Sequence, residues 1–171
     1  MSVSPRLQTW LEVRGIETSD DPEFLKMVPW LRTTFLACGS LVGIATAFAF
    51  TPLLWLMVPI AAAGAIFRVH PFDGIYNYGI RHVIGTRKLA PNGAPTRFAC
   101  AMATPWIAAI ALAFHFDATP LAYVLGALLT ATAWLVGTTH FCIPSFIYQY
   151  FFGDRELALR TVSRLSEEQV A

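Results

Sequence analysis

Two long apolar stretches dominate the pattern of hydrophobic and polar residues along the chain. Residues 33–67 contain no Asp, Glu, Lys or Arg, and residues 98–153 contain a single charged residue, Asp117. Each stretch is too long for one membrane span of about 20 residues and about right for two. Pro52 and Pro120 lie near the midpoints, where each stretch is expected to turn. The pattern therefore predicts two helical hairpins.

The four expected spans divide the chain into segments. They cover residues 33–50, 53–67, 98–116 and 121–139. The predicted organisation is an N-terminal cytoplasmic or interfacial segment (1–32), a first hairpin with a basic loop (33–97), a second hairpin (98–153) and an amphipathic C-terminal helix (154–171). The fold class that follows is an all-α integral membrane protein with four transmembrane helices.

Composition agrees with this class. The chain is 56% hydrophobic and 13% charged, whereas soluble domains carry about 25% charged residues. Charged residues are scattered through the first 26 positions, and no apolar run precedes Val28, so no cleavable signal peptide is expected. The net charge of +1 gives no indication of a nucleic acid partner, and none is expected.

The two halves of the chain resemble each other. Three pairs of segments match in the same order: Thr34-Phe-Leu-Ala-Cys38 with Thr96-Arg-Phe-Ala-Cys100, the stretches around Pro52 and Pro120, and His70 followed by Ile75-Tyr-Asn-Tyr78 with His140 followed by Ile147-Tyr-Gln-Tyr150. We interpret them as an internal duplication. Each copy has an even number of spans, so the copies share one orientation and form a parallel repeat with a pseudo-two-fold axis along the membrane normal.

The distribution of basic residues predicts the orientation. All twelve Lys and Arg lie in the N-terminal segment, the central loop and the C-terminal segment, with four, five and three respectively. By the positive-inside rule, both termini and the loop 68–97 are cytoplasmic in a bacterial inner membrane. The loop's basic residues are expected to contact lipid headgroups: Arg68, Arg81, Arg87, Lys88 and Arg97.

The polar segments are expected to contain helices at the membrane surface. Apolar residues recur at helical spacing over residues 72–85, with Gly85 as the stop. Asp154 is expected to cap a helix that runs to about residue 169, with Glu156 and Arg160 spaced i,i+4. A short surface helix is also predicted within residues 1–19. Such amphipathic helices lie in the interface plane.

Small residues mark one face of the first span. Gly39, Gly43 and Ala47 follow a small-xxx-small pattern, which lets two helix backbones approach closely in lipid. Chance is the alternative, because Gly and Ala are abundant in this chain. The pattern predicts one close helix contact on this face.

Histidines and cysteines gather in one predicted layer on the cytoplasmic side. His70 and His140 end the two returning spans, while Cys38 and Cys100 begin the outgoing ones, and Cys142 and His82 lie nearby. These residue types are ligands for zinc or copper. The simpler interpretation makes the cysteines small packing residues with no cofactor. A soft metal or a haem at His70, His140 and Cys142 is the alternative.

A family resemblance rests on two short motifs. Arg97-Phe98-Ala99 and Phe141-Cys142-Ile-Pro-Ser145-Phe-Ile-Tyr148 make residues 33–152 similar to a family of small bacterial integral membrane proteins of unknown function. In that family the second motif reads Phe-Cys-x-x-Cys-x-x-Tyr, and here Ser145 replaces the second cysteine. A Cys-x-x-Cys pair could exchange disulfides or bind a soft metal, but one cysteine with a serine cannot form that local disulfide.

Two functions follow from these observations. The first is a non-catalytic accessory or structural subunit of a larger membrane complex, because the sequence carries no catalytic constellation. The alternative is a membrane thiol, metal or haem redox protein, or a small transporter, that uses the His/Cys layer. The expected partners are lipids, other membrane subunits or a second copy of the chain. The residues expected to contact a ligand or partner are His70, Tyr76, Tyr78, His82, His140, Cys142, Ser145, Tyr148 and Tyr150.

Overall fold

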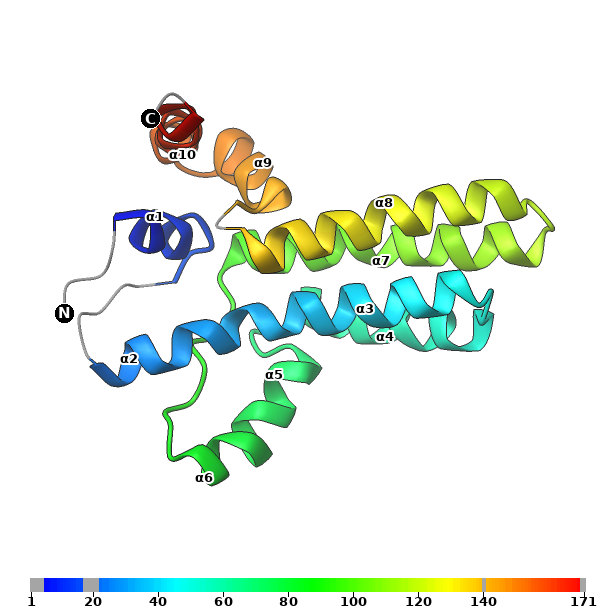
Figure 1. Cartoon of the computed structure of the whole chain (residues 1–171), viewed down its shortest axis with the longest axis horizontal. Helices are drawn as coiled ribbons and strands as arrows, with labels where there is room; N and C mark the ends of the chain where they lie inside the picture. Colours follow the sequence, from blue (N-terminus) through cyan, green and yellow to red (C-terminus); the bar gives the residue numbers. More distant parts are fainter. Residues whose placement is uncertain (1–4, 17–21, 140, 170–171) are drawn as a thin grey trace.

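Four long helices run side by side in the computed structural model, and the shorter helices gather at one end of them (Figure 1). The structure describes residues 5–16, 22–139 and 141–169. The described elements, in chain order, are α1 (Pro5–Val13), α2 (Pro22–Met27), the 3₁₀ turn η1 (Val28–Arg32), α3 (Thr33–Ala47), α4 (Thr51–Ile66), α5 (Pro71–Ile75), the π-helical turn η2 (Tyr76–Ile80), α6 (Arg81–Ile84), α7 (Ala94–His115), α8 (Thr119–Thr138), α9 (Ile143–Phe152) and α10 (Arg155–Gln169).

The long helices have the length and composition of membrane spans. Among the described residues, three helices are long and apolar enough to cross a membrane: Val28–Ala47, which joins η1 to α3, and then α7 and α8. Helix α4 has only 16 residues, and it is long enough to cross a membrane only when it is counted together with Pro71–Ile84. The two segments are bent by 81° relative to each other. The prediction of an all-helical membrane protein is confirmed, with three such spans, or four when the bent pair counts as one.

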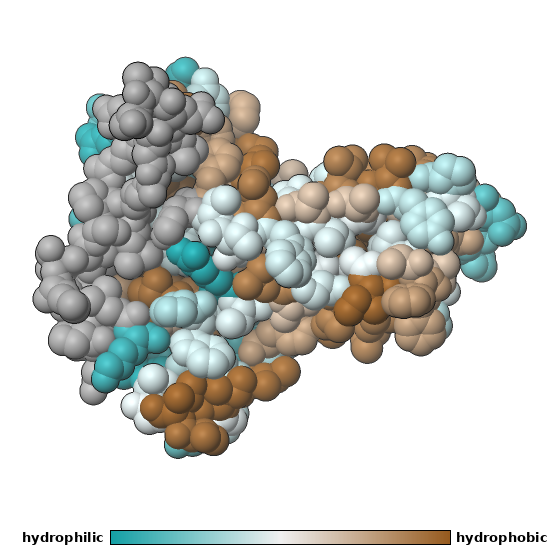
Figure 2. Space-filling model, in the orientation of Figure 1, coloured by the Kyte–Doolittle hydropathy of each residue, from teal (hydrophilic) through white to brown (hydrophobic). Residues whose placement is uncertain are grey.

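The outer surface of the bundle fits a lipid environment. Large apolar side chains such as Trp55, Leu56, Val124 and Leu128 are about half exposed on the long helices. Figure 2 shows hydrophobic and pale residues along the bundle, with hydrophilic residues at its far tip and where the other helices join it. Water would not favour this exposure, whereas lipid tails are as apolar as these side chains.

The turns of the two hairpins have the same backbone geometry. Ala49 (φ 48°) and Asp117 (φ 57°) both take the left-handed conformation, each directly after the phenylalanine that ends the preceding helix. In both hairpins the next helix begins with a threonine and a proline, at Thr51 and Thr119. Left-handed backbone is uncommon outside glycine, so its recurrence at matching positions supports the duplication.

The hairpins pack against each other through small residues. Helix α3 packs on α8, and α4 packs on α7. A Cβ atom built on Gly39 would lie 2.7 Å from the Ala133 Cβ, and one built on Gly126 would lie 2.3 Å from the Thr46 Cγ2. Neither distance leaves room for a side chain, so the helix backbones approach closely. The predicted close contact of the Gly39 face is confirmed.

The N-terminal helix covers the end of the bundle. The sequence predicts a surface helix within residues 1–19, but Trp10 and Leu11 of α1 are buried, together with Ile16. They belong to an apolar cluster that includes Leu31 and Tyr76, from η1 and η2. The predicted helix forms, and its apolar residues pack against the short helices at the end of the bundle.

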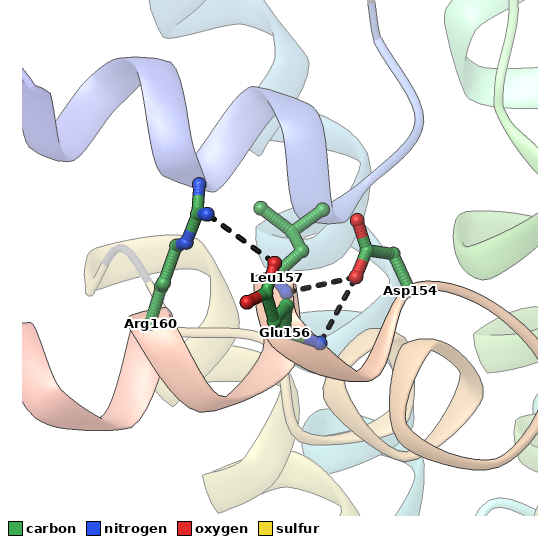
Figure 3. A network of polar contacts seen from close by, with 4 residues as sticks. All are labelled: Asp154, Glu156, Leu157 and Arg160. Carbon is green, nitrogen blue, oxygen red and sulfur yellow. Dashed lines mark hydrogen bonds and ion pairs between the residues drawn. The ribbon is translucent and has the colours of Figure 1, made fainter.

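Two further predicted helices form. Residues 71–84 make a continuous arm of α5, η2 and α6, which ends at Gly85 in the left-handed conformation (φ 65°). Before α10, the Asp154 carboxylate accepts hydrogen bonds from the backbone N–H groups of Glu156 (2.9 Å) and Leu157 (3.2 Å) (Figure 3). The Arg160 guanidinium lies 3.4 Å from the Glu156 carboxylate.

Candidate functional site

A cavity of about 100 Å³ lies where the short helices meet the bundle. Its inner wall is apolar and includes Val42, Met57, Ala61, Ile107 and Leu129 from the four long helices. The groups that carry chemistry lie around the rest of the wall: Arg14, Thr34, Cys38, His70, Asp73, Asn92, Thr96, Cys100 and Cys142. Three cysteines that are far apart in the sequence thus line one space, as the predicted His/Cys layer requires.

The two predicted copies of the repeat contribute matching sequence positions to this wall. His70 is the residue before α5, and Cys142 is the residue before α9. Each stands five positions before an Ile-Tyr-x-Tyr sequence. The sequence pairs His70 with His140, but by position the counterpart of His70 is Cys142. His140 itself, with its predicted place opposite His70, lies outside the described residues.

His70 is held in one orientation by the start of α5. Its Nδ1 accepts a hydrogen bond from the Phe72 N–H (3.3 Å), so the neutral ring carries its proton on Nε2. That nitrogen lies 4.0 Å from the Cys38 sulfur. Burial lowers the pKa of His70, and the nearby Asp73 carboxylate raises it in partial opposition. The ring is therefore a neutral donor that faces the thiols.

Asp73 ties three segments together beneath the cavity. Its Oδ1 accepts a hydrogen bond from the Thr34 hydroxyl of α3 (2.5 Å). Its Oδ2 accepts from the Asn92 side chain (2.8 Å) and from the backbone N–H of His70 (3.3 Å). The carboxylate is 7% exposed, so these donors replace water. The bonds hold the His70 segment against α3.

Cys142 has two features that place positive potential at its sulfur. It precedes the first turn of α9, where helix dipoles and free N–H groups favour negative charge. The Ser145 hydroxyl donates a hydrogen bond to the Cys142 sulfur (3.1 Å). Both side chains are buried. Ser145 therefore orients the thiol rather than pairing with it covalently.

Cys38 and Cys100 occupy matching positions of the repeat on α3 and α7. A Cβ atom built on Gly64 of α4 would lie 2.2 Å from His70 Cδ2 and 3.1 Å from the Cys100 sulfur, so both groups press against this glycine. All three cysteines are free thiols. Within the described ranges, no three His, Cys, Asp or Glu side chains are grouped to hold a metal ion.

Arg14 is the functional candidate that sequence reasoning missed. Its side chain is 2% exposed, with Nη1 3.3 Å from the Leu31 carbonyl and the guanidinium carbon 4.7 Å from the Trp10 ring centre. Its Nε has no hydrogen-bond partner. Burial lowers the pKa of Arg14, while Cys142 and Asp73 raise it in opposition. Nothing in the local sequence distinguishes it from the other basic residues of the N-terminal segment.

The other residues predicted to contact a ligand or partner lie away from the cavity. Tyr76 is buried, and its hydroxyl is 2.6 Å from the Thr86 hydroxyl. Tyr78 and His82 are exposed on the arm. Two tyrosines of α9 make local contacts: Tyr148 packs on the Phe98 ring, and Tyr150 accepts a hydrogen bond from Arg155 (2.9 Å).

The basic residues predicted to contact headgroups lie at the same end of the bundle. Arg68, Arg87 and Lys88 are exposed. Hydrogen bonds to backbone carbonyls are formed by Arg81 and Arg97. Arg81 donates a hydrogen bond to the Asn77 carbonyl, and Arg97 donates one to the Ala65 carbonyl at the end of α4 (2.9 Å).

The fold and the cavity define a class: helical membrane proteins with a cavity at one end of the bundle that is lined by cysteines. Residues 21–152 match the domain-of-unknown-function family DUF4395, and the chain belongs to that family. The predicted membership of a family of unknown function is thereby confirmed. The match includes all three cysteines and His70, while Arg14 precedes it. The chain matches no curated protein and no solved structure.

Proposed function

We propose that this protein carries out thiol chemistry at Cys142, inside a cavity at the cytoplasmic end of a four-span bundle. The observation that carries the proposal is the convergence of three free cysteines and His70 on one small space. Thiols used only for packing have no reason to face a cavity together with a buried arginine. Among the three, Cys142 alone combines a helix N-terminus with a hydroxyl donor.

The proposed role of each neighbour follows from its contacts. Ser145 and the first turn of α9 stabilise negative charge on the Cys142 sulfur. His70 presents its Nε2 proton toward the Cys38 sulfur, and its backbone N–H is held by Asp73. Cys38 and Cys100 lie in the apolar part of the bundle, where a thiolate is disfavoured. Cys142 is therefore the reactive thiol.

The test compares the reaction rates of the three thiols. Methyl methanethiosulfonate converts a thiol to a methyl disulfide and releases methanesulfinate, and mass spectrometry locates the modification. If solvent exposure alone set the reaction rates, Cys142 would react slowest, because it is 3% exposed while Cys38 and Cys100 are half-buried. The proposal expects Cys142 to react at least about tenfold faster than either. Equal rates, or Cys142 as the slowest thiol, would refute it.

A gain-of-function variant provides a second test. Ser145→Cys places a sulfur where the hydroxyl oxygen now lies 3.1 Å from the Cys142 sulfur, so a small shift reaches the disulfide length of about 2.05 Å. Incubation with bis(2-hydroxyethyl) disulfide should oxidise the pair and release two molecules of mercaptoethanol. Ser145→Ala is the matched control and should remain reduced. Failure of the cysteine variant to oxidise would mean that the cavity does not admit thiol reagents.

The proposal includes a topology. All twelve basic residues lie at the end of the bundle that holds the short helices, and none lies in the turns at the opposite end. We infer four spans as two parallel hairpins in a bacterial inner membrane, with both termini cytoplasmic and the arm on the membrane surface. A fluorescent protein fused to residue 171 should fluoresce, and alkaline phosphatase inserted at residue 118 should be active. The reverse pattern would contradict the orientation.

An accessory role in a larger complex is the second candidate. It is supported by the arm, where Tyr78 is 79% exposed and Val83 is 90% exposed. In mild detergent, a complex formed through the arm should give a mass above that of one chain with its detergent. Tyr78→Ser with Val83→Ser should release it, whereas Phe116→Ser at the far turn should not. A single-chain mass for the wild type would reject this role.

A further inference from the structure

Arg14 is a buried cation that forms no ion pair with any described residue. Its Nη1 donates to a neutral carbonyl, two aromatic rings flank the guanidinium, and its Nε has no partner. An arginine does not lose its proton in proteins. A buried guanidinium without a counter-charge is strongly unfavourable. The charge therefore calls for an anion.

Among the described residues, the carboxylate that acts on the charge of Arg14 is that of Asp73, and it is already engaged. Asp73 also lines the cavity, but its oxygens accept hydrogen bonds from Thr34, Asn92 and the His70 backbone. These contacts hold Asp73 toward α3 and the loop before α7. The Asp73 carboxylate lowers the cost of the arginine's charge from a distance without pairing with it.

The cavity offers space for an anion beside Arg14. It measures about 100 Å³. A cavity of about 150 Å³ holds benzene in another protein, so this one suits roughly four or five non-hydrogen atoms. Its apolar wall strengthens electrostatic attraction, because few water molecules screen the charge. The N-terminus of α9, preceded by Cys142, adds positive potential on another side.

We propose that the cavity binds a small organic or inorganic anion, with its negative group on the Arg14 guanidinium and its other end beside the Cys142 sulfur. This inference rests on the proposed function, since it names the class of ligand presented to that thiol. Guanidinium groups favour planar anions such as carboxylates, which accept two parallel hydrogen bonds.

The first experiment measures anion binding without any reaction. Acetate and acetamide have the same shape and four non-hydrogen atoms, and they differ in charge. With sodium gluconate to hold the ionic strength, 100 mM acetate should raise the Tm of the purified protein in detergent by about 3–6 °C, as expected for a Kd near 10 mM. Acetamide should leave it unchanged. Equal effects of the two probes would overturn the proposal.

Two variants identify the group responsible. Arg14→Gln removes the charge and should abolish the difference between acetate and acetamide. Arg14→Lys keeps the charge but loses the planar fork, and it should retain part of the difference. An acetate effect that survives in the glutamine variant would place the anion elsewhere and overturn the proposal. The comparison of probes in the wild type remains decisive if either variant fails to fold.

The second experiment places the anion beside the thiol. Iodoacetate and iodoacetamide both alkylate cysteine with loss of iodide, and only the first is an anion. The ratio of their rates at Cys142 should fall by about tenfold or more in Arg14→Gln. An unchanged ratio would overturn the proposed position of the anion. Acetate binding through Arg14 with an unreactive Cys142 would instead refute the thiol function and retain the anion site.

Discussion

The hydrogen bonds of Asp73 give a quantitative prediction about stability. Asp73→Ala leaves three buried donors without acceptors: the Thr34 hydroxyl, the Asn92 amide and the His70 N–H. Each unsatisfied donor costs about 1–3 kcal/mol, so we expect a loss of roughly 3–6 kcal/mol after partial relaxation. For a domain of this size, about 2–4 °C of Tm corresponds to each kcal/mol. The Tm should therefore fall by roughly 6–24 °C.

Asp73→Asn separates hydrogen bonding from charge. An asparagine can keep its oxygen toward Asn92 and His70 and donate from its amide to the Thr34 hydroxyl, because a hydroxyl also accepts. It should cost only about 1–2 kcal/mol, for the loss of charge assistance. Unfolding can be followed with a maleimide dye that becomes fluorescent when the buried thiols are exposed. If Asp73→Asn and Asp73→Ala lose equal stability, the hydrogen bonds do not explain the loss. The electrostatic effect of the Asp73 charge on the cavity would explain it instead.

Three further outcomes follow from single contacts. Gly126→Ala should lower the free energy of unfolding by about 1–3 kcal/mol, because the added Cβ would lie 2.3 Å from Thr46. Gly79→Ala is the matched control, because a Cβ added there meets no atom within 4 Å. It should be neutral or stabilising in the same thermal assay. Burial lowers the pKa of His70, so the unfolded state binds more protons below pH 6.5 and stability falls as the pH drops. The variant His70→Asn, which still caps α5, should therefore show a flatter profile of Tm against pH between pH 7.5 and 5.5. An unchanged slope would contradict the assignment of this pH dependence to His70. Asp154→Ala should cost about 1 kcal/mol and reduce helicity measured by circular dichroism, whereas undiminished helicity would show that this cap is dispensable.

The sequence alone was sufficient for the features that depend on local patterns. Two apolar stretches and their prolines predict the hairpins, because a span must be apolar over its whole length. Gly85 ends the arm and Asp154 caps α10 as expected, because caps depend on a few neighbouring residues. Matching motifs indicate the duplication. These inferences require no knowledge of which helix packs on which.

The repeat also shows where a sequence match is ambiguous. Two histidines precede the two Ile-Tyr-x-Tyr sequences, at distances of five and seven residues. The backbone resolves this, because the residue that stands where the following helix begins is His70 in one copy and Cys142 in the other. A cysteine thus occupies the position of a histidine, and no matching of residue types would have paired them.

The sequence by itself predicts the membrane class, the hairpins and the charge asymmetry behind the proposed orientation, because hydropathy and charge act on each segment separately. The tertiary structure alone decided which side chains share the cavity. Cys38, Cys100 and Cys142 come together because α3 packs on α8, α4 on α7 and α9 on α7. Arg14 reaches them because α1 covers the end of the bundle. Such contacts depend on how the shapes of side chains from distant segments fit together. The order of hydrophobic and polar residues along the chain does not predict that fit.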